Sequence, residues 1–153
     1  HTEEDEPRVA LVSRFPIVDV ESYSTFPEDI STPLGTQFRR PPLRVTIQLK
    51  NNQILQIFVL HLKSKLPDFL EHEDKTDLLL HAKATARSLN IRAHEAVAIR
   101  QLVLKHNHLP TIIIGDLNDS SRSVTTNILL GPKPHGNFST EQRQHFWSNR
   151  FFF

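Results

Sequence analysis

The amino-acid sequence predicts an α/β fold, and three segments carry this prediction. Leu43–Leu49 alternates apolar and polar side chains, the pattern of a strand with one buried face. Ile54–Leu60 is almost wholly apolar, as expected of a central strand, and Thr111–Ile114 consists of β-branched residues. An amphipathic helix is expected between the last two, over Arg92–His106. This order of strand, helix and strand is typical of α/β domains.

The N-terminal part of the chain predicts one further strand and a long loop. Val9–Ser13 is a short apolar run that indicates a buried strand, which Pro16 should end. Asp19–Pro42 contains four prolines and little periodicity, so we expect a long surface excursion there. Asn51-Asn52 tolerates positive φ and predicts a tight turn between the two strands that flank it.

The helical segments differ in the strength of their signal. A loose helical tendency covers Leu78–Leu89, whereas Arg92–His106 has apolar residues at roughly helical spacing, with Arg100 as a polar exception. The apolar positions of the second segment are Ala93, Ala96, Val97, Val103 and Leu104. Asn107 and Pro110 should end this helix. Beyond Val124–Leu130 we expect weak structure, and Phe151–Phe153 has no periodic explanation.

Length and composition limit the possible functions. The 153 residues suffice for a single domain, and 18 basic against 17 acidic side chains exclude a broad electrostatic attraction to polyanions. Local basic patches are possible at Arg39, Arg40 and Arg44, where a solvated surface is the favoured interpretation, and at Lys63 with Lys65. Zero cysteines exclude disulfides and thiolate chemistry within this sequence. No apolar run approaches the ~20 residues of a membrane span, and no signal peptide is evident, so we expect a soluble chain of unknown compartment.

The strongest chemical motif is Gly115-Asp116-Leu117-Asn118-Asp119, directly after the predicted strand Thr111–Ile114. Ligand sites in open α/β sheets favour the carboxyl ends of strands. Asp116 could bind a hard cation or orient a water molecule there, and the Asn118 amide could donate to a phosphate oxygen. The alternative is a simple Asx turn that ends the strand, and these five residues alone favour that alternative.

A second motif, His61-Leu62-Lys63-Ser64, follows the other apolar strand. A histidine at a strand end can transfer a proton or donate a hydrogen bond to a phosphoryl oxygen, and Lys63 adds positive charge. The coincidence of two apolar strands that each end in such groups, with Arg92 at the start of the intervening helix, strengthens the interpretation. We expect the strands that end at His61 and Asp116 to lie side by side or nearly so, with both side chains at one edge of the sheet. A metal site made only of histidines is disfavoured, since no HExxH motif is present.

The motifs together resemble a known family. Four blocks occur in the order found in the endonuclease/exonuclease/phosphatase superfamily, whose fold is that of DNase I, and the resemblance extends through Ser123–Gly131 to about Trp147. The four blocks are Val9–Ile17, Val59–Lys65, Arg92–Val103 and Pro110–Asp119.

This resemblance implies a four-layer α/β sandwich with mostly antiparallel sheets and a metal-dependent phosphoesterase or nuclease-like hydrolase that uses Mg²⁺ or Mn²⁺. Asp116 would orient or activate the attacking water, Asn118 would position the phosphate near the metal, and His61 would hydrogen-bond the phosphoryl group. The metal ligands among these would be Asp116 and Asn118. The partner would be a phosphate-ester substrate, with nucleic acid among the candidates.

Two further blocks of the family pattern are not found in residues 1–153. These are an early strand that ends in a metal-binding Glu and a final Ser-Asp-His block, and the acidic residues of Glu3–Glu6 lie in a charged run instead. We therefore expect residues 1–153 to form one partial domain of this superfamily, weak or inactive as an isolated catalyst. The alternative is a non-catalytic remnant that binds a partner.

Overall fold

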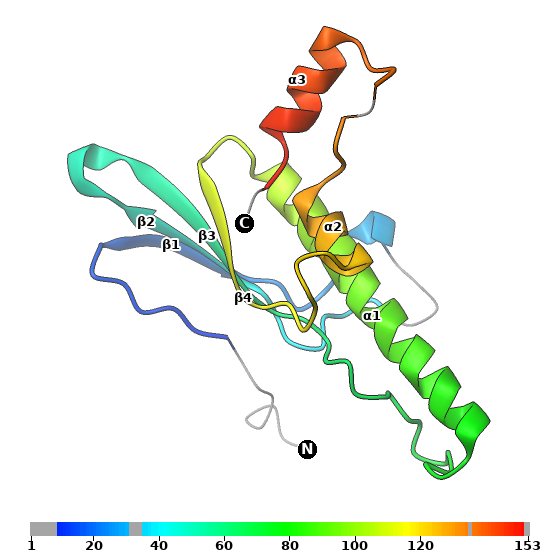
Figure 1. Cartoon of the computed structure of the whole chain (residues 1–153). Coiled ribbons are helices and arrows are strands. Elements are labelled where there is room, and N and C mark those ends of the chain that lie inside the picture. The colour runs from blue at the N-terminus through cyan, green and yellow to red at the C-terminus, as the bar shows by residue number, and fades with distance from the viewer. Residues whose placement is uncertain (1–8, 31–34, 135, 152–153) are drawn as a thin grey trace.

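The computed structural model describes residues 9–30, 35–134 and 136–151, and it has the predicted α/β class. Its sheet is mixed and has four strands in the order β1-β2-β3-β4 (Figure 1). Pairs β1–β2 and β2–β3 are antiparallel, whereas β3–β4 is parallel. The strands are β1 (Ile17–Ser22), β2 (Leu43–Gln48), β3 (Ile54–His61) and β4 (Thr111–Asp116).

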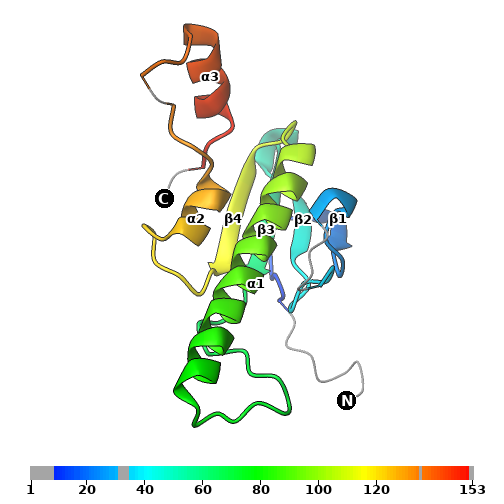
Figure 2. The same cartoon turned by 90° about the vertical axis from the view of Figure 1, so that its right-hand side faces the viewer.

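The helices pack to one side of this sheet. The long helix α1 (Leu78–Lys105) connects β3 to β4 and crosses one face of the sheet, and α2 (Val124–Leu130) packs beside it (Figure 2). Helix α3 (Thr140–Ser148) and the short 3-10 helices η2 (Glu28–Ile30) and η3 (Lys50–Asn52) complete the elements. In the described part of the chain, no helix has the length and apolar character needed to cross a bilayer.

The predicted hairpin between β2 and β3 is confirmed. Its turn contains Asn51 and Asn52 with φ of 66° and 60°, the left-handed region that asparagine tolerates better than most residues. The strand register pairs Gln48 with Ile54 next to the turn. The predicted central position of β3 is also confirmed, because β3 pairs with β2 on one side and β4 on the other.

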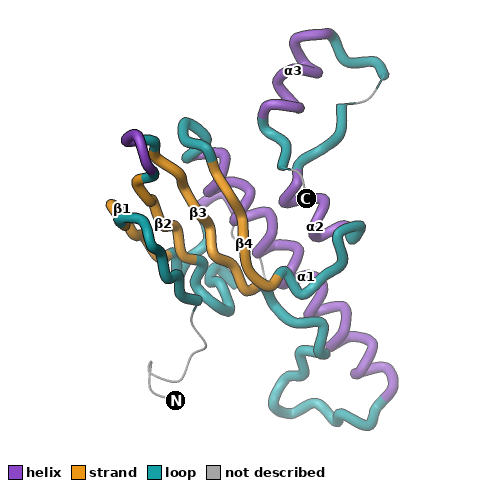
Figure 3. Tube along the Cα trace, turned by 60° about the vertical axis from the view of Figure 1, so that its left-hand side comes forward, coloured by secondary structure: helices purple, strands orange, loops and turns teal. Residues whose placement is uncertain are grey.

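The two faces of the sheet have different environments. Phe58 and Leu60 of β3 pack into the core with Ile99 and Leu102 of α1, and all four are nearly inaccessible to solvent. The alternate residues point to the opposite face. Figure 3 shows that no helix covers this opposite face, which we call the helix-free face. Three of its apolar residues are about half exposed: Val20 at 55%, Ile112 at 45% and Ile114 at 43%.

The predictions for the N-terminal part place the strand at the wrong position in the sequence. Val9–Ser13 forms no strand, and the strand lies instead at Ile17–Ser22, which overlaps the start of the segment expected to be a surface excursion. The search for apolar runs missed this strand because β1 is an edge strand in which every residue is exposed to solvent. The rest of that segment also contributes to the core, through Phe38. Glu3–Glu6 lies outside the described residues.

The helical tendency of Leu78–Leu89 and the burial of Ala96 and Val103 are confirmed, but the start of the main helix and part of its buried face were predicted wrongly. One continuous helix of 28 residues begins at Leu78, so Arg92 lies inside it and does not open it. The expected apolar positions Val97 and Leu104 are each 39% exposed. The true buried face includes polar residues, which a search for apolar periodicity passes over. Its members are Ala84, Ser88, Ile91, Arg92, Glu95, Ala96, Ala98, Ile99, Leu102 and Val103.

The C-terminal part is more structured than expected. Val124–Leu130 and Thr140–Ser148 are helices, and each begins with a serine N-cap; the second has a full capping box of Ser139 and Gln142. Phe151 packs against the core and hydrogen-bonds the Leu130 carbonyl through its backbone N–H. This contact explains one aromatic residue of the terminal run, whereas 152 and 153 lie outside the described residues.

Gly115 is required for the pairing of β3 with β4. Its φ is +122°, and a Cβ at this position would overlap the backbone carbonyl of Leu60. We expect Gly115→Ala to lower the free energy of unfolding by at least about 2 kcal/mol, through backbone strain and overlap with a rigid neighbour. Gly136→Ala is the matched control, since a Cβ at Gly136 has nothing within 4 Å. Urea denaturation would measure both variants, and equal stabilities would contradict this account.

Candidate functional site

The predicted convergence of the two strand ends is confirmed. Because β3 and β4 are parallel and adjacent, their register pairs His61 directly with Asp116 at the carboxyl edge of the sheet. The His61 Nε2 atom lies 4.0 Å from the Asp116 Oδ2 atom. Both side chains are accessible, at 35% and 64%. By strand alternation both belong to the helix-free face, so the pair lies where that apolar face meets the sheet edge.

Asn118 is held beside this pair by two hydrogen bonds. Its backbone N–H donates to the Asp116 Oδ1 atom at 2.8 Å, and its side-chain Nδ2 donates to the Leu62 carbonyl at 2.9 Å. Its φ of 50° is the left-handed region, which asparagine adopts at little cost. The second bond orients the amide, because Nδ2 faces Leu62 and Oδ1 is left as the acceptor. His61, Asp116 and Asn118 thus come together as the sequence predicts.

The turn that holds Asn118 is also the Asx turn of the alternative interpretation. Asp116 Oδ1 accepts the N–H two residues ahead, as in such a turn. The turn engages one carboxylate oxygen and leaves the side chain 64% exposed. A structural turn and an accessible carboxylate therefore coexist at Asp116.

Asp119 has a different role, although it belongs to the same motif. Its side chain is only 8% exposed and lies 3.0 Å from the Lys65 Nζ atom and 3.4 Å from the Arg92 Nε atom. Burial alone would raise the pKa of Asp119, but hydrogen bonds from Lys65, Ser120 and Ser123 outweigh burial and lower the pKa to about 2. Asp119 therefore ties the two motif loops together and is not free to bind a ligand.

Arg92 and Glu95 connect α1 to the same edge. Arg92 is 4% exposed and donates to the carbonyls of Lys63 and Ser64, each at 3.2 Å. Glu95 is 1% exposed and accepts the backbone N–H groups of Lys63 at 2.6 Å and Arg39 at 3.0 Å. Burial raises the pKa of Glu95, and these two hydrogen bonds act in the opposite direction. The sequence drew attention to Arg92 but did not indicate its burial, and it gave no role to Glu95; the only signal for either is a charge on the buried helix face.

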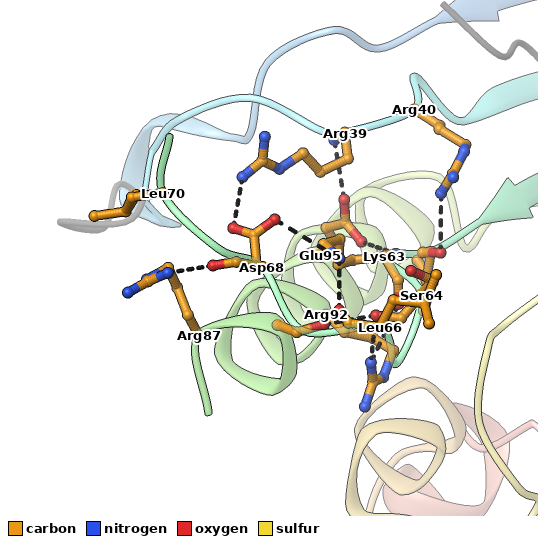
Figure 4. A network of polar contacts seen from close by, with 12 residues as sticks. Arg39, Arg40, Lys63, Ser64, Leu66, Asp68, Leu70, Arg87, Arg92 and Glu95 are labelled. Carbon is orange, nitrogen blue, oxygen red and sulfur yellow. Dashed lines mark hydrogen bonds and ion pairs between the residues drawn. The ribbon is translucent and has the colours of Figure 1, made fainter. Parts of the chain in front are cut away.

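The predicted basic patches are divided by the fold. Arg44 is not a solvated residue, because its side chain is 12% exposed and lies 2.8 Å from carboxylate oxygens of both Asp19 and Glu21. Burial lowers the pKa of Arg44, but hydrogen bonds to Glu21 and Tyr23 outweigh it and raise that pKa. Arg39 and Arg40 lie elsewhere, next to Lys63 at the carboxyl edge of β3 (Figure 4).

The donor set at the edge suits a hard cation in part. Mg²⁺ in proteins is commonly held by one or two carboxylates together with water and substrate phosphate, and Asp116 with the Asn118 Oδ1 atom offers one carboxylate and one neutral oxygen. Among residues 9–30, 35–134 and 136–151, no group of three or more His, Asp or Glu side chains is placed to hold a metal ion. Any cation here would therefore retain several water ligands.

Comparison of the chain with protein-family models, with curated proteins and with solved structures gives no match. The interpretation of this edge therefore depends on its own geometry.

The role of Asp119 gives a pH-dependent prediction. A carboxyl group with a folded pKa of about 2 against an ordinary 3.8 adds stability above pH ~4 and loses it as the pH falls toward 2. We expect Asp119→Asn to cost roughly 2 kcal/mol at pH 7 and progressively less below pH 4. Urea titrations from pH 7 to pH 2.5 would measure the difference, with exposed Asp116→Asn as the control. A deficit that does not change with pH would contradict the ion-pair role.

The role of Glu95 gives a second prediction. Glu95→Ala leaves two backbone N–H groups without acceptors, so we expect a loss of about 2 kcal/mol in unfolding free energy. We also expect faster hydrogen exchange at the amides of Arg39 and Lys63. Lys83→Ala, an exposed position on the same helix, is the control. Unchanged protection of both amides in the Glu95 variant would exclude this role.

Proposed function

We propose that this chain carries the catalytic edge of a metal-dependent phosphoester hydrolase. The observation that carries the proposal is the pairing of His61 with Asp116 at the ends of two parallel strands, with Asn118 fixed beside them. Carboxyl ends of strands are where α/β sheets place their ligand sites. An accessible carboxylate, an imidazole and an oriented amide are the groups that phosphoryl transfer to water requires.

Each side chain has a distinct task in this proposal. Asp116 orients the attacking water and, with the Asn118 Oδ1 atom, holds the Mg²⁺ or Mn²⁺ ion. His61 donates a hydrogen bond to the phosphoryl group. When bound, the metal ion would stabilise the negative charge that develops on the phosphate oxygens. The fixed hydrogen bonds of Asn118 keep this arrangement in place without substrate.

The helix-free face supports the finer fold assignment, the four-layer sandwich of the endonuclease/exonuclease/phosphatase superfamily. In such a sandwich each sheet has helices outside and an apolar face inside. The sheet described here has α1 on one face and half-exposed Val20, Ile112 and Ile114 on the other. Packing of a second sheet on that face would cover these residues and would place His61 and Asp116 at the rim of the interface.

The second candidate function is binding of a partner without catalysis. The observation that favours it is the same helix-free face, since exposed apolar side chains that share a face mark interaction surfaces as well as inner layers. The two functions differ at Asp116, which only the hydrolase requires. Titration with Mg²⁺, followed by the amide resonances of residues 116–118, would show saturable shifts for a hydrolase and none for a partner-binding fragment.

Substitution of the edge residues tests catalysis directly. We expect slow Mg²⁺-dependent hydrolysis of bis(4-nitrophenyl) phosphate, which Asp116→Ala and His61→Ala each reduce by about 10²–10⁴-fold. Because both side chains are accessible strand-end groups, the melting temperatures should stay within a few degrees of the parent. Asp74→Ala, an exposed loop carboxylate away from this edge, is the control. Activity that survives both edge substitutions, or that is absent from the parent chain, would defeat the proposal.

A further inference from the structure

An open, shallow cavity of about 230 Å³ lies among side chains that Figure 4 draws as sticks. Arg39 and Arg40 line it from the segment before β2, and Lys63 and Ser64 line it from the segment after β3. Asp68 completes the lining. Three cationic side chains from two separate segments therefore border one open space, and clustered cations of this kind favour an oxyanion.

The carboxylates nearby engage these cations unequally. Asp68 lies 3.1 Å from the Arg39 Nη2 atom and 3.7 Å from the Lys63 Nζ atom. Glu95, behind the cavity, accepts only backbone N–H groups. Within the described residues, Arg40 forms no ion pair, and three cations face two carboxylates when Glu95 is counted. The lining therefore retains positive charge.

Arg40 also has an unused donor. Its Nη1 atom donates to the Leu62 carbonyl at 3.3 Å, which fixes the guanidinium. Its Nε atom is shielded from solvent and has no hydrogen-bond partner. Because this atom is closed to solvent, a ligand in the cavity would have to approach the guanidinium through its Nη groups.

We propose that this cavity binds a phosphate group, held by the guanidinium groups of Arg39 and Arg40 with Lys63 and the Ser64 hydroxyl. Arginine forks match the geometry of phosphate oxygens, and the ammonium of Lys63 adds charge. Phosphate would share Arg39 and Lys63 with Asp68, whereas Arg40 has no carboxylate within ion-pair distance among the described residues.

The position of the cavity indicates what that phosphate belongs to. The Leu62 carbonyl that accepts from Arg40 also accepts from Asn118, so one backbone atom joins the cavity to the candidate site. Lys63 is two residues beyond His61, and their Cα atoms are at most about 7 Å apart. Neighbouring phosphates of a polynucleotide strand have a comparable spacing. The cavity would thus hold the phosphate group next to the scissile phosphate, and the substrate would be a polynucleotide. This assignment of the substrate rests on the proposed function.

Binding of inorganic phosphate to the whole chain, without metal, tests the cavity itself. We expect saturable shifts in the amide resonances of Arg39, Arg40, Lys63 and Ser64 during titration at low ionic strength. Arg40→Gln should weaken the affinity roughly tenfold, the effect of losing one charge-assisted contact. Arg39→Gln, at a side chain that is 52% exposed, should weaken it similarly without a risk to folding. Arg143→Gln, whose guanidinium bonds backbone carbonyls at 136 and 138, is the control.

A single-stranded tetrathymidylate, in EDTA, tests the assignment to a polynucleotide. We expect Arg40→Gln to weaken its binding roughly tenfold and to reduce the salt dependence by about one counterion. Absence of saturable phosphate shifts, or equal shifts in both cavity variants and the control, would overturn the phosphate site. Phosphate binding with no effect of Arg40→Gln on tetrathymidylate would overturn the polynucleotide assignment. If both probes bind as expected but bis(4-nitrophenyl) phosphate is not hydrolysed, the cavity stands and the hydrolase proposal fails.

Discussion

Two buried charged side chains on α1, Arg92 and Glu95, determine the shape of the sheet edge. Arg92 donates to the carbonyls of residues 63 and 64, and Glu95 accepts the N–H of residue 63. The chain that leaves β3 therefore has its polar backbone groups satisfied by helix residues 28 to 32 positions later in sequence, as buried backbone groups require. Burial of these charges costs free energy that an apolar pair would avoid. The compensating gain is a loop with a defined conformation next to His61.

The fold gives the two aspartates of the Gly115–Asp119 motif different roles. Asp116 has an exposed carboxylate at the strand end. Asp119, three residues after Asp116, has a largely buried side chain and forms ion pairs with Lys65 and Arg92. The motif therefore supplies both the reactive group and the ion pair that holds its loop. Gly115, between the last apolar residue and Asp116, lets β4 approach the Leu60 carbonyl closely enough to bring the strand ends into register.

Sequence reasoning succeeded where a local signal determines the outcome. Alternation located β2, continuous apolarity located β3, and the polar motifs after two apolar strands predicted the meeting of His61 with Asp116. The parallel direction of the β3–β4 pair was not predicted. It failed where tertiary contacts override local signals. Edge strand β1 has no buried residue to reveal it, and the core stripe of α1 contains Ser88, Arg92 and Glu95. Because the buried face of α1 contains hydrogen-bonding residues as well as apolar ones, its sequence shows no clear hydrophobic periodicity. The cavity lined by Arg39 and Lys63 depends on the same long-range contacts.

The length of α1 has a mechanical consequence. Its 28 residues span about 42 Å, whereas the eight residues of β3 span about 27 Å, so the first turns extend beyond the sheet (Figure 1). No residue from 78 to 83 is buried, and Leu78 is 88% exposed. This overhang is secured mainly by the Asp77 cap and by the Arg87–Glu73 ion pair. If these turns unwind locally, the adjoining loop keeps its anchor, because Asp68 donates its backbone N–H to the Ala84 carbonyl and its own carbonyl accepts from Arg87, both beyond the overhang. The first turns of the helix can therefore open without displacing Asp68 from the wall of the cavity.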